Sequence, residues 1–245
     1  MAEISQVEGP RGNPLAYAYT EGQGPCVVFL SGYRSDMEGT KAVHLEAWAQ
    51  AQGRAFLRLD YSGHGQSGGV FEKGCIGDWA ADAEAVIRHV TSGPVVLVGS
   101  SMGGWIACLL SQRLELAGFV GIAAAPDFTE DSFWAGFSLA ERQKVMEEGR
   151  LLQPSAFEDP YVVTRKLIED GRENLVLRAP LPMPWKVRLM QGTQDEAVTR
   201  ETALKLLDHI EGENVQLTFV RGADHRFSSP HCLALIETML EDVLG

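Results

Sequence analysis

The segment around residue 101 constrains the fold more than any other part of the sequence. Residues 94–98 form a short apolar run, the sequence Gly99-Ser100-Ser101-Met102-Gly103 follows, and apolar residues then recur at helical spacing over 106–110. A G-x-S-x-G sequence between a buried strand and a helix is typical of a nucleophile elbow, in which a serine occupies a sharp strand-to-helix turn. Because Ser101 has glycine two residues before it and two residues after it, this serine is the candidate nucleophile.

Short β-rich runs alternate with longer helical patterns along most of the chain. Alternation of this kind is typical of a mostly parallel sheet covered by helices on both faces. In the last expected strand, apolar and polar residues alternate, which predicts a half-exposed strand near the sheet edge. The expected strands are 15–20, 26–30, 55–59, 95–98, 119–123, 187–190 and 215–220, and the expected helices lie near 38–52, 77–91, 103–114, 200–210 and 231–243.

Residues 127–184 interrupt this alternation and contain no convincing strand. Ser138 and Glu141 have the spacing of a capping box, which predicts the start of a helix there. A second helical pattern covers about 161–170 and stops at the glycine that follows. The segment therefore predicts a small helical insertion rather than a continuation of the sheet.

We expect this insertion, residues 127–184, to form a cap on a core made of residues 1–126 and 185–245. Its aromatic side chains are sufficient to roof a pocket, but each of them serves equally well to anchor the cap to the core. Trp134 and Phe137 are the candidates for substrate contact, within a set that comprises Phe133, Trp134, Phe137, Phe157 and Tyr161.

A serine nucleophile needs a base and an acid that orients the base. Neutral imidazole is a suitable base because its ordinary pKa lies near neutrality, and a buried carboxylate fixes its tautomer. In folds with a nucleophile elbow the chain order is Ser, acid, His. Asp195 follows the strand expected at 187–190, and His225 lies on the loop after the last expected strand. The sequence therefore predicts a triad of Ser101, His225 and Asp195.

Other residues compete for the roles of acid and base. Glu196 and Asp224 are the alternative carboxylates, and Asp224 has the place of a turn residue beside the base. His64 lies in a loop but far too early in the chain, and the remaining histidines fall in or near helical patterns.

The tetrahedral intermediate of such a reaction needs backbone N–H donors for its oxyanion. Met102 follows the nucleophile at the start of a helix, where N–H groups are free and the helix dipole favours negative charge. After the strand at 26–30, Gly32 allows a tight turn, which makes the N–H of Tyr33 the second candidate donor. Arg34 is a candidate for binding an anionic substrate group, although we favour its pairing with Asp36.

Composition excludes several other classes of function. The formal net charge is −12, which disfavours binding to nucleic acid and to anionic lipid. No apolar run is long enough to span a bilayer, and the N-terminus lacks the pattern of a secretory or transit peptide, so we expect a cytoplasmic protein. The four cysteines have no metal-site spacing and the glycine-rich 60–68 segment lacks the G-K-[ST] of a phosphate loop, so no metal or cofactor is expected.

Together these segments resemble the α/β-hydrolase superfamily, over essentially the whole chain outside the cap. One branch, which includes acyl-glucuronide esterases and mitochondrial palmitoyl-protein thioesterases, resembles the chain more closely in a set of segments: Ser31-Gly32-Tyr33, 37–42, Asp60-Tyr61-Ser62-Gly63, 99–105 and Asp224-His225-Arg226. The resemblance implies an α/β-hydrolase fold with about eight strands. It also implies that Gln191, where histidine is common in relatives, affects pocket packing more than mechanism.

The resemblance implies a serine hydrolase that cleaves a small-molecule acyl ester, thioester or acyl glucuronide through an acyl-enzyme. The same triad also supports C–C bond hydrolysis, perhydrolysis or acyl transfer, and fold alone does not choose among these reactions. A non-catalytic ligand-binding protein on the same scaffold is the remaining alternative. Acyl-chain length, leaving group and oligomeric state stay open.

Overall fold

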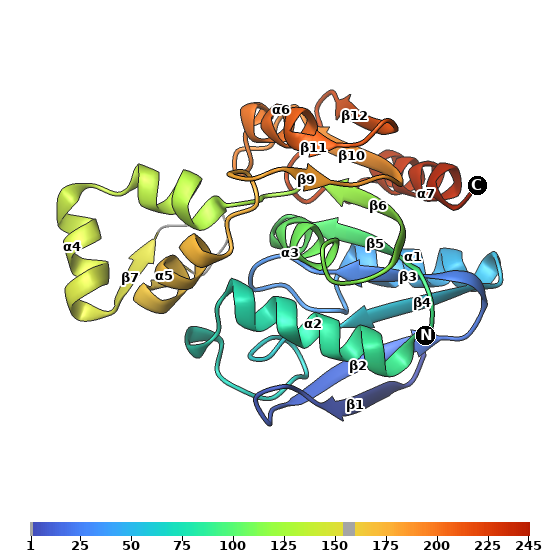
Figure 1. Ribbon diagram of the computed structural model, residues 1–245, viewed down its shortest axis with the longest axis horizontal. Helices are drawn as coiled ribbons and strands as arrows, with labels where there is room; N and C mark the ends of the chain where they lie inside the picture. The colour runs from blue at the N-terminus through green and yellow to red at the C-terminus, as the bar shows by residue number, and fades with distance from the viewer. Residues whose placement is uncertain (1, 154–159) are drawn as a thin grey trace.

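The central feature of the computed structural model is an eight-stranded sheet with helices on both faces (Figure 1). The structure describes residues 2–153 and 160–245, so Phe157 lies outside the described residues. Strand β2 pairs antiparallel with β1 and β4, and the other pairs are parallel. In spatial order the strands are β1 (Ile4–Glu8), β2 (Pro14–Thr20), β4 (Arg54–Leu59), β3 (Gln23–Leu30), β5 (Val95–Ser100), β6 (Leu116–Ile122), β10 (Lys186–Gly192) and β12 (Val215–Val220).

Two apolar cores, one on each face, hold the helices to the sheet. Successive side chains of a strand point to opposite faces, so Val27 and Phe29 join one core while Val28 and Leu30 join the other. Burial of each such side chain contributes about 1.5–3 kcal/mol. The first core contains α1 (Thr40–Ala51) and α7 (Pro230–Leu244), and the second contains α2 (Ile76–Val90), α3 (Met102–Leu110) and α6 (Arg200–His209).

The predicted mostly parallel sheet is confirmed, with one strand that the sequence did not reveal. Strand β1 forms a hairpin with β2, and its five residues are exposed or only half-buried. A short strand with so little apolar content carries a weak sequence signal. At the opposite side of the sheet, β12 is an edge strand as predicted, and Phe219 is 40% exposed there.

The excursion between β6 and β10 contains both helices and strands. The capping box predicted at Ser138 and Glu141 is present at the start of α4 (Leu139–Glu148). The expectation that 127–184 holds no strand is wrong, because three short strands occur there. The remaining elements are a π-helical turn η2 (Thr129–Trp134), β7 (Arg150–Gln153), β8 (Tyr161–Thr164), α5 (Arg165–Glu173) and β9 (Leu181–Pro182), while β11 (Ile210–Glu211) and the 3₁₀ turn η1 (Phe71–Lys73) lie in the rest of the chain.

The sequence predicts a helix over about 161–170, but its first four residues form strand β8. This difference has a physical cause. Residues 161–164 read Tyr-Val-Val-Thr, which has high β propensity, and they pair antiparallel with β7. Helix α5 therefore begins after Thr164, whose side chain accepts a hydrogen bond from the N–H of Leu167. It runs on through Gly171 rather than stopping there.

A single carboxylate joins the two ends of the excursion. Asp127, which follows β6, is completely buried. Its carboxylate accepts hydrogen bonds from the N–H groups of Val176 and Leu177, at 2.8 and 3.0 Å, and from the guanidinium of Arg178 at 2.9 Å. Burial raises the pKa of Asp127 although these donors oppose the shift. The chain therefore leaves the core and returns to it at one point, and the inserted segment lies between these two crossings.

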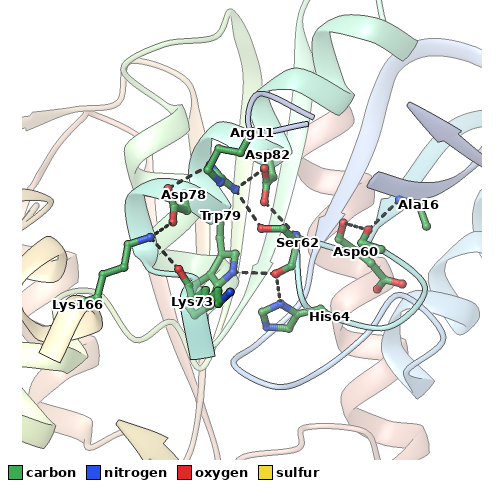
Figure 2. A network of polar contacts seen from close by, with 11 residues as sticks. Arg11, Ala16, Asp60, Ser62, His64, Lys73, Asp78, Trp79, Asp82 and Lys166 are labelled. Carbon is green, nitrogen blue, oxygen red and sulfur yellow. Dashed lines mark hydrogen bonds and ion pairs between the residues drawn. The ribbon is translucent and has the colours of Figure 1, made fainter. Parts of the chain in front are cut away.

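A polar network fastens the cap helix α5 to the core (Figure 2). Lys166 of α5 donates to Asp78 of α2 and to the carbonyl of Lys73. Arg11 joins Asp78 to Asp82, with N···O distances of 3.1 and 2.6 Å. These contacts link the turn between β1 and β2, helix α2 and helix α5.

No helix in the described ranges could cross a membrane.

His64 lies beside this network as a buried, neutral side chain. Its Nδ1 atom is 3.3 Å from the carbonyl oxygen of Ser62 (Figure 2). Its ring packs edge-on against Tyr61, Phe71 and Trp79. Burial lowers the pKa of His64 to about 4, because a charged imidazolium is poorly solvated there.

Acid should therefore destabilise the protein partly through His64. Between about pH 6.5 and 4 the unfolded chain binds a proton at this residue that the folded protein does not, so the free energy of unfolding falls by up to about 1.4 kcal/mol per pH unit. We expect His64→Phe to reduce this slope. Urea unfolding of both proteins from pH 7 to 4.5 measures it, and equal slopes would contradict the assignment.

Candidate active site

Ser101 occupies a strained turn between β5 and α3. Its backbone angles are φ 54° and ψ −118°, which few residues other than glycine adopt. The flanking glycines are required by space: a Cβ on Gly99 would lie 2.5 Å from the carbonyl oxygen of Gly103, and one on Gly103 would lie 2.0 Å from that of Leu30. The turn thus has the geometry of a nucleophile elbow.

The three residues predicted as a triad lie together in the structure. Nε2 of His225 is 3.2 Å from Oγ of Ser101, and Nδ1 of His225 is 2.9 Å from Oδ2 of Asp195. Asp195 follows β10 and His225 follows β12, so neighbouring parallel strands deliver acid and base to the same edge of the sheet. With Nδ1–H donated to the carboxylate, Nε2 is placed to accept the proton of the serine hydroxyl.

Asp195 is held as a buried carboxylate. Its side chain is fully buried, whereas that of His225 is 21% exposed. Burial opposes ionisation, but hydrogen bonds from His225, from the backbone and from Gln191 hold the pKa of Asp195 below its ordinary value. Of the competing carboxylates, Asp224 accepts a hydrogen bond from the N–H of Phe227 as a turn residue, and Glu196 is exposed.

The two predicted oxyanion donors lie beside Ser101. Met102 is the first residue of α3, where backbone N–H groups have no partner inside the helix. Within the part of the chain that the structure describes, no hydrogen bond uses the N–H of Tyr33. Gly32 brings this turn close, because a Cβ on it would lie 3.3 Å from Cβ of Ser101. The arrangement leaves two N–H groups next to Ser101.

Tyr33 also connects this turn to the cap. Its hydroxyl donates a 2.7 Å hydrogen bond to the carbonyl oxygen of Val162 in β8. Its ring makes edge-on contacts with a group of aromatic rings, and burial raises the pKa of the phenol, so it remains a protonated donor. The rings in contact are those of Phe71, Trp79, Phe128, Phe133 and Tyr161.

Two cavities meet at Ser101, and both are also lined by Tyr33, Tyr161 and His225. The cap-side cavity, about 390 Å³, is walled mainly by apolar groups. The loop-side cavity, about 330 Å³, has polar and apolar walls in equal measure, and its polar walls carry hydroxyl and charged groups. The cap-side walls include Ala125, Phe128, Phe133, Gly136 and Val198, and the loop-side walls include Ser31, Ser35, Asp36, Thr40, Lys41, Arg226 and Ser228.

Lys41 braces the loop that carries His225. Its ammonium group donates to the carbonyl oxygen of Arg226 at 2.5 Å, which ties the start of α1 to the residue after the base. Burial is the main cause that lowers the pKa of Lys41, to about 8. Sequence reasoning did not single out this lysine for a role in the site, because its contact is with a backbone atom 185 residues away.

The three residues proposed for substrate contact lie elsewhere. Trp134 is packed between the guanidinium groups of Arg142 and Arg172, which lie 5.3 and 4.4 Å from its ring centre. Phe137 is buried against Phe133. Neither of these two aromatics lines the cavities described above, and Phe133 and Tyr161 contribute the cap's aromatic walls instead.

Arg34 likewise lines neither of the two cavities at Ser101. Its Nη1 donates to the carbonyl oxygen of Pro160, and its guanidinium lies 5.9 Å from the ring centre of Phe71. Among the ion pairs of the described residues, none joins Arg34 to Asp36. It lines a third cavity, with Glu72.

A metal site is not formed by the described side chains. Outside residues 1 and 154–159, no group of three or more His, Cys, Asp and Glu side chains could hold a metal ion. The four cysteines are free thiols, and all are buried. They pack as small apolar side chains, as expected.

Comparison with known proteins places the chain in a family. A model described as "Alpha/beta hydrolase family" matches residues 27–232. The rat protein "Palmitoyl-protein thioesterase ABHD10, mitochondrial" is 31% identical, over 98% of this chain and 82% of its own length. The mouse protein of the same name is 32% identical, over 94% and 78%.

Comparison with solved structures supports the same family. A hydrolase from Agrobacterium vitis S4 is 36% identical and superposes with a TM-score of 0.96 over 100% of both chains. Alpha/beta hydrolase domain-containing protein 10 from mouse is 28% identical, with a TM-score of 0.91 over 99% of this chain and 98% of its own. The chain therefore belongs to the α/β-hydrolase family and is an enzyme of the hydrolase class.

Proposed function

We propose that this protein is a serine hydrolase that cleaves carboxylic esters or thioesters through an acyl-enzyme. The observation that carries the proposal is the contact of Ser101 Oγ with His225 Nε2, while Asp195 holds the other ring nitrogen. A binding protein on this scaffold would not need this connected geometry. The name of the rat and mouse relatives, palmitoyl-protein thioesterase, supports thioesters within this class.

The proposed reaction has two halves. Ser101 attacks the acyl carbon while His225 takes its proton, and the N–H groups of Tyr33 and Met102 stabilise the oxyanion. His225 then protonates the leaving alcohol or thiol, and a water molecule repeats the sequence on the acyl-enzyme. Asp195 stays ionised throughout and stabilises the imidazolium.

The two cavities suggest how the substrate lies. An acyl chain gains free energy by burial against apolar walls, so the cap-side cavity suits the acyl group. A polar leaving group suits the loop-side cavity, where hydroxyl and charged side chains can form hydrogen bonds. In this orientation the carbonyl carbon lies at the junction, beside Ser101.

The nucleophile is tested by labelling with a fluorophosphonate and by hydrolysis of p-nitrophenyl esters. We expect the wild-type protein to be labelled, and Ser101→Ala to lose labelling and kcat, on the order of 10⁶-fold where such triads have been dissected. Ser111→Ala is the matched control, because Ser111 lies just beyond the opposite end of α3.

Either of two results would overturn the proposal. One is a folded wild-type protein that neither labels nor turns over esters, which would favour the binding-protein alternative. The other is Ser101→Ala with turnover close to wild type.

The acyl cavity is tested by truncating one of its walls. Phe133 lines the cap-side cavity and packs against Phe128 and Tyr161, with ring centres 5.1 and 6.0 Å apart. We expect Phe133→Ala to shift the preferred acyl chain to longer esters, since each methylene newly buried contributes about 0.8 kcal/mol. A series of p-nitrophenyl esters from two to sixteen carbons, roughly the span from short esters to palmitoyl, measures kcat/KM for each length.

Trp134→Ala is the control for this experiment, because it removes a neighbouring aromatic ring that lies outside the cavity. The same shift in both variants, or no shift in Phe133→Ala, would contradict the assignment of the cap-side cavity to the acyl group.

A further inference from the structure

Gln191, near the end of β10, points its amide at the acid of the triad. The side chain is completely buried. Its Nε2 lies 2.9 Å from Oδ2 of Asp195 and 3.0 Å from the carbonyl oxygen of Val198. One amide thus bridges the first and last residues of the turn that carries the acid.

The neighbours of this amide determine its orientation. A carboxylate oxygen and a carbonyl oxygen are both acceptors, so the NH₂ group must face them, and the reversed amide would place its oxygen against both. Oε1 then has no hydrogen-bond partner among the described residues. An unpaired buried acceptor lowers stability. Packing alone would be better served by an apolar side chain of the same size, and the two donor contacts account for the amide.

The amide completes the set of hydrogen bonds that fixes the carboxylate. Oδ2 of Asp195 accepts from Gln191 and from Nδ1 of His225, both at 2.9 Å. Oδ1 accepts from the N–H groups of Ala197 and Val198, also at 2.9 Å. Four donors therefore hold a single rotamer of Asp195. Val198 in turn lines the cap-side cavity, so the same amide supports a wall of that cavity.

We propose that Gln191 is a positioning residue for the base, acting through Asp195. It holds the carboxylate in the orientation that aligns His225 with Ser101. Its N–H group also stabilises part of the negative charge on Oδ2 of Asp195, the atom that His225 contacts. This inference rests on the proposed function, since it assigns a role within that triad. It differs from what the family resemblance implies, namely an effect on pocket packing more than on mechanism.

Loss of the amide donor has a predictable effect on the base. Oδ2 then becomes a stronger acceptor for Nδ1–H of His225, so the imidazolium is favoured and the pKa of the base rises. The titratable and charged groups around His225 are Asp195, which contacts it, Asp224 next to it in the chain, Glu196 in the cap-side cavity, and Lys41 and Arg226 in the loop-side cavity.

The experiment compares Gln191→Met and Gln191→Glu with wild type. Gln191→Met keeps the size and removes the donor, while Gln191→Glu keeps the shape and, because a second buried carboxyl beside Asp195 takes up a proton, keeps an O–H donor. For Gln191→Met we expect kcat on p-nitrophenyl esters to fall roughly ten- to hundredfold, as loss of a hydrogen bond to a charged group implies, with KM changed less than about threefold. The acid limb of kcat/KM against pH should move to higher pH in Gln191→Met and stay closer to wild type in Gln191→Glu.

Gln143→Met is the matched control. Gln143 on α4 is exposed and its amide donates to the carboxylate of Glu147 at 3.0 Å, so the same kind of bond is removed far from the triad. Thermal unfolding checks that each variant is folded. We expect the control to keep wild-type kcat and pH profile.

Three outcomes decide the inference. A fall in kcat with a shifted acid limb supports it. Wild-type kcat and limb in folded Gln191→Met overturn it, and so does a loss of stability and rate with an unmoved limb, which would indicate a structural role alone. If wild type lacks Ser101-dependent turnover, the proposed function fails first, which labelling of Ser101 reveals separately.

Discussion

The site depends on one strained backbone position. Ser101 adopts φ 54°, and a conformation of this kind costs about 1–3 kcal/mol. Every residue of β5 is buried, as are eight of the nine residues of α3, so packing on both sides holds the turn. The strain lifts the serine hydroxyl out of the strand and towards His225, and it places the N–H of Met102 beside it.

Hydrogen bonds connect the inserted segment to the edge of the sheet near Ser101. Tyr33 contributes a backbone N–H beside the nucleophile and a hydroxyl bonded to β8, so the turn and the cap constrain each other. Lys166 of α5 and Asp78 of α2 fasten the opposite side of the cap to the core. The walls of the cap-side cavity are therefore positioned by the same contacts that position the backbone N–H of Tyr33.

Local signals in the sequence predicted the core and the proximity of Ser101, His225 and Asp195. The motif at Ser101 and the order of residues after successive strands need no knowledge of distant contacts. The inserted segment was harder to predict, because β8 forms through pairing with β7. Phe133 and Trp134 are adjacent aromatic residues of one helical turn, and the direction in which each side chain points decides which of them lines the cap-side cavity. Gln191 was visible as an unusual residue, but its hydrogen bond to Asp195 depends on a turn geometry that spacing does not reveal.

The carboxylate of Asp127 joins the start of the insertion to Val176, 49 residues further along the chain. Closing a longer loop costs only slightly more entropy, so insertions and deletions between these two residues lower the free energy of folding only slightly. Proteins that evolve from such a chain could therefore exchange or enlarge the inserted segment while Ser101, His225 and Asp195 keep their positions. Substrate range and reaction chemistry would then evolve on separate parts of one gene.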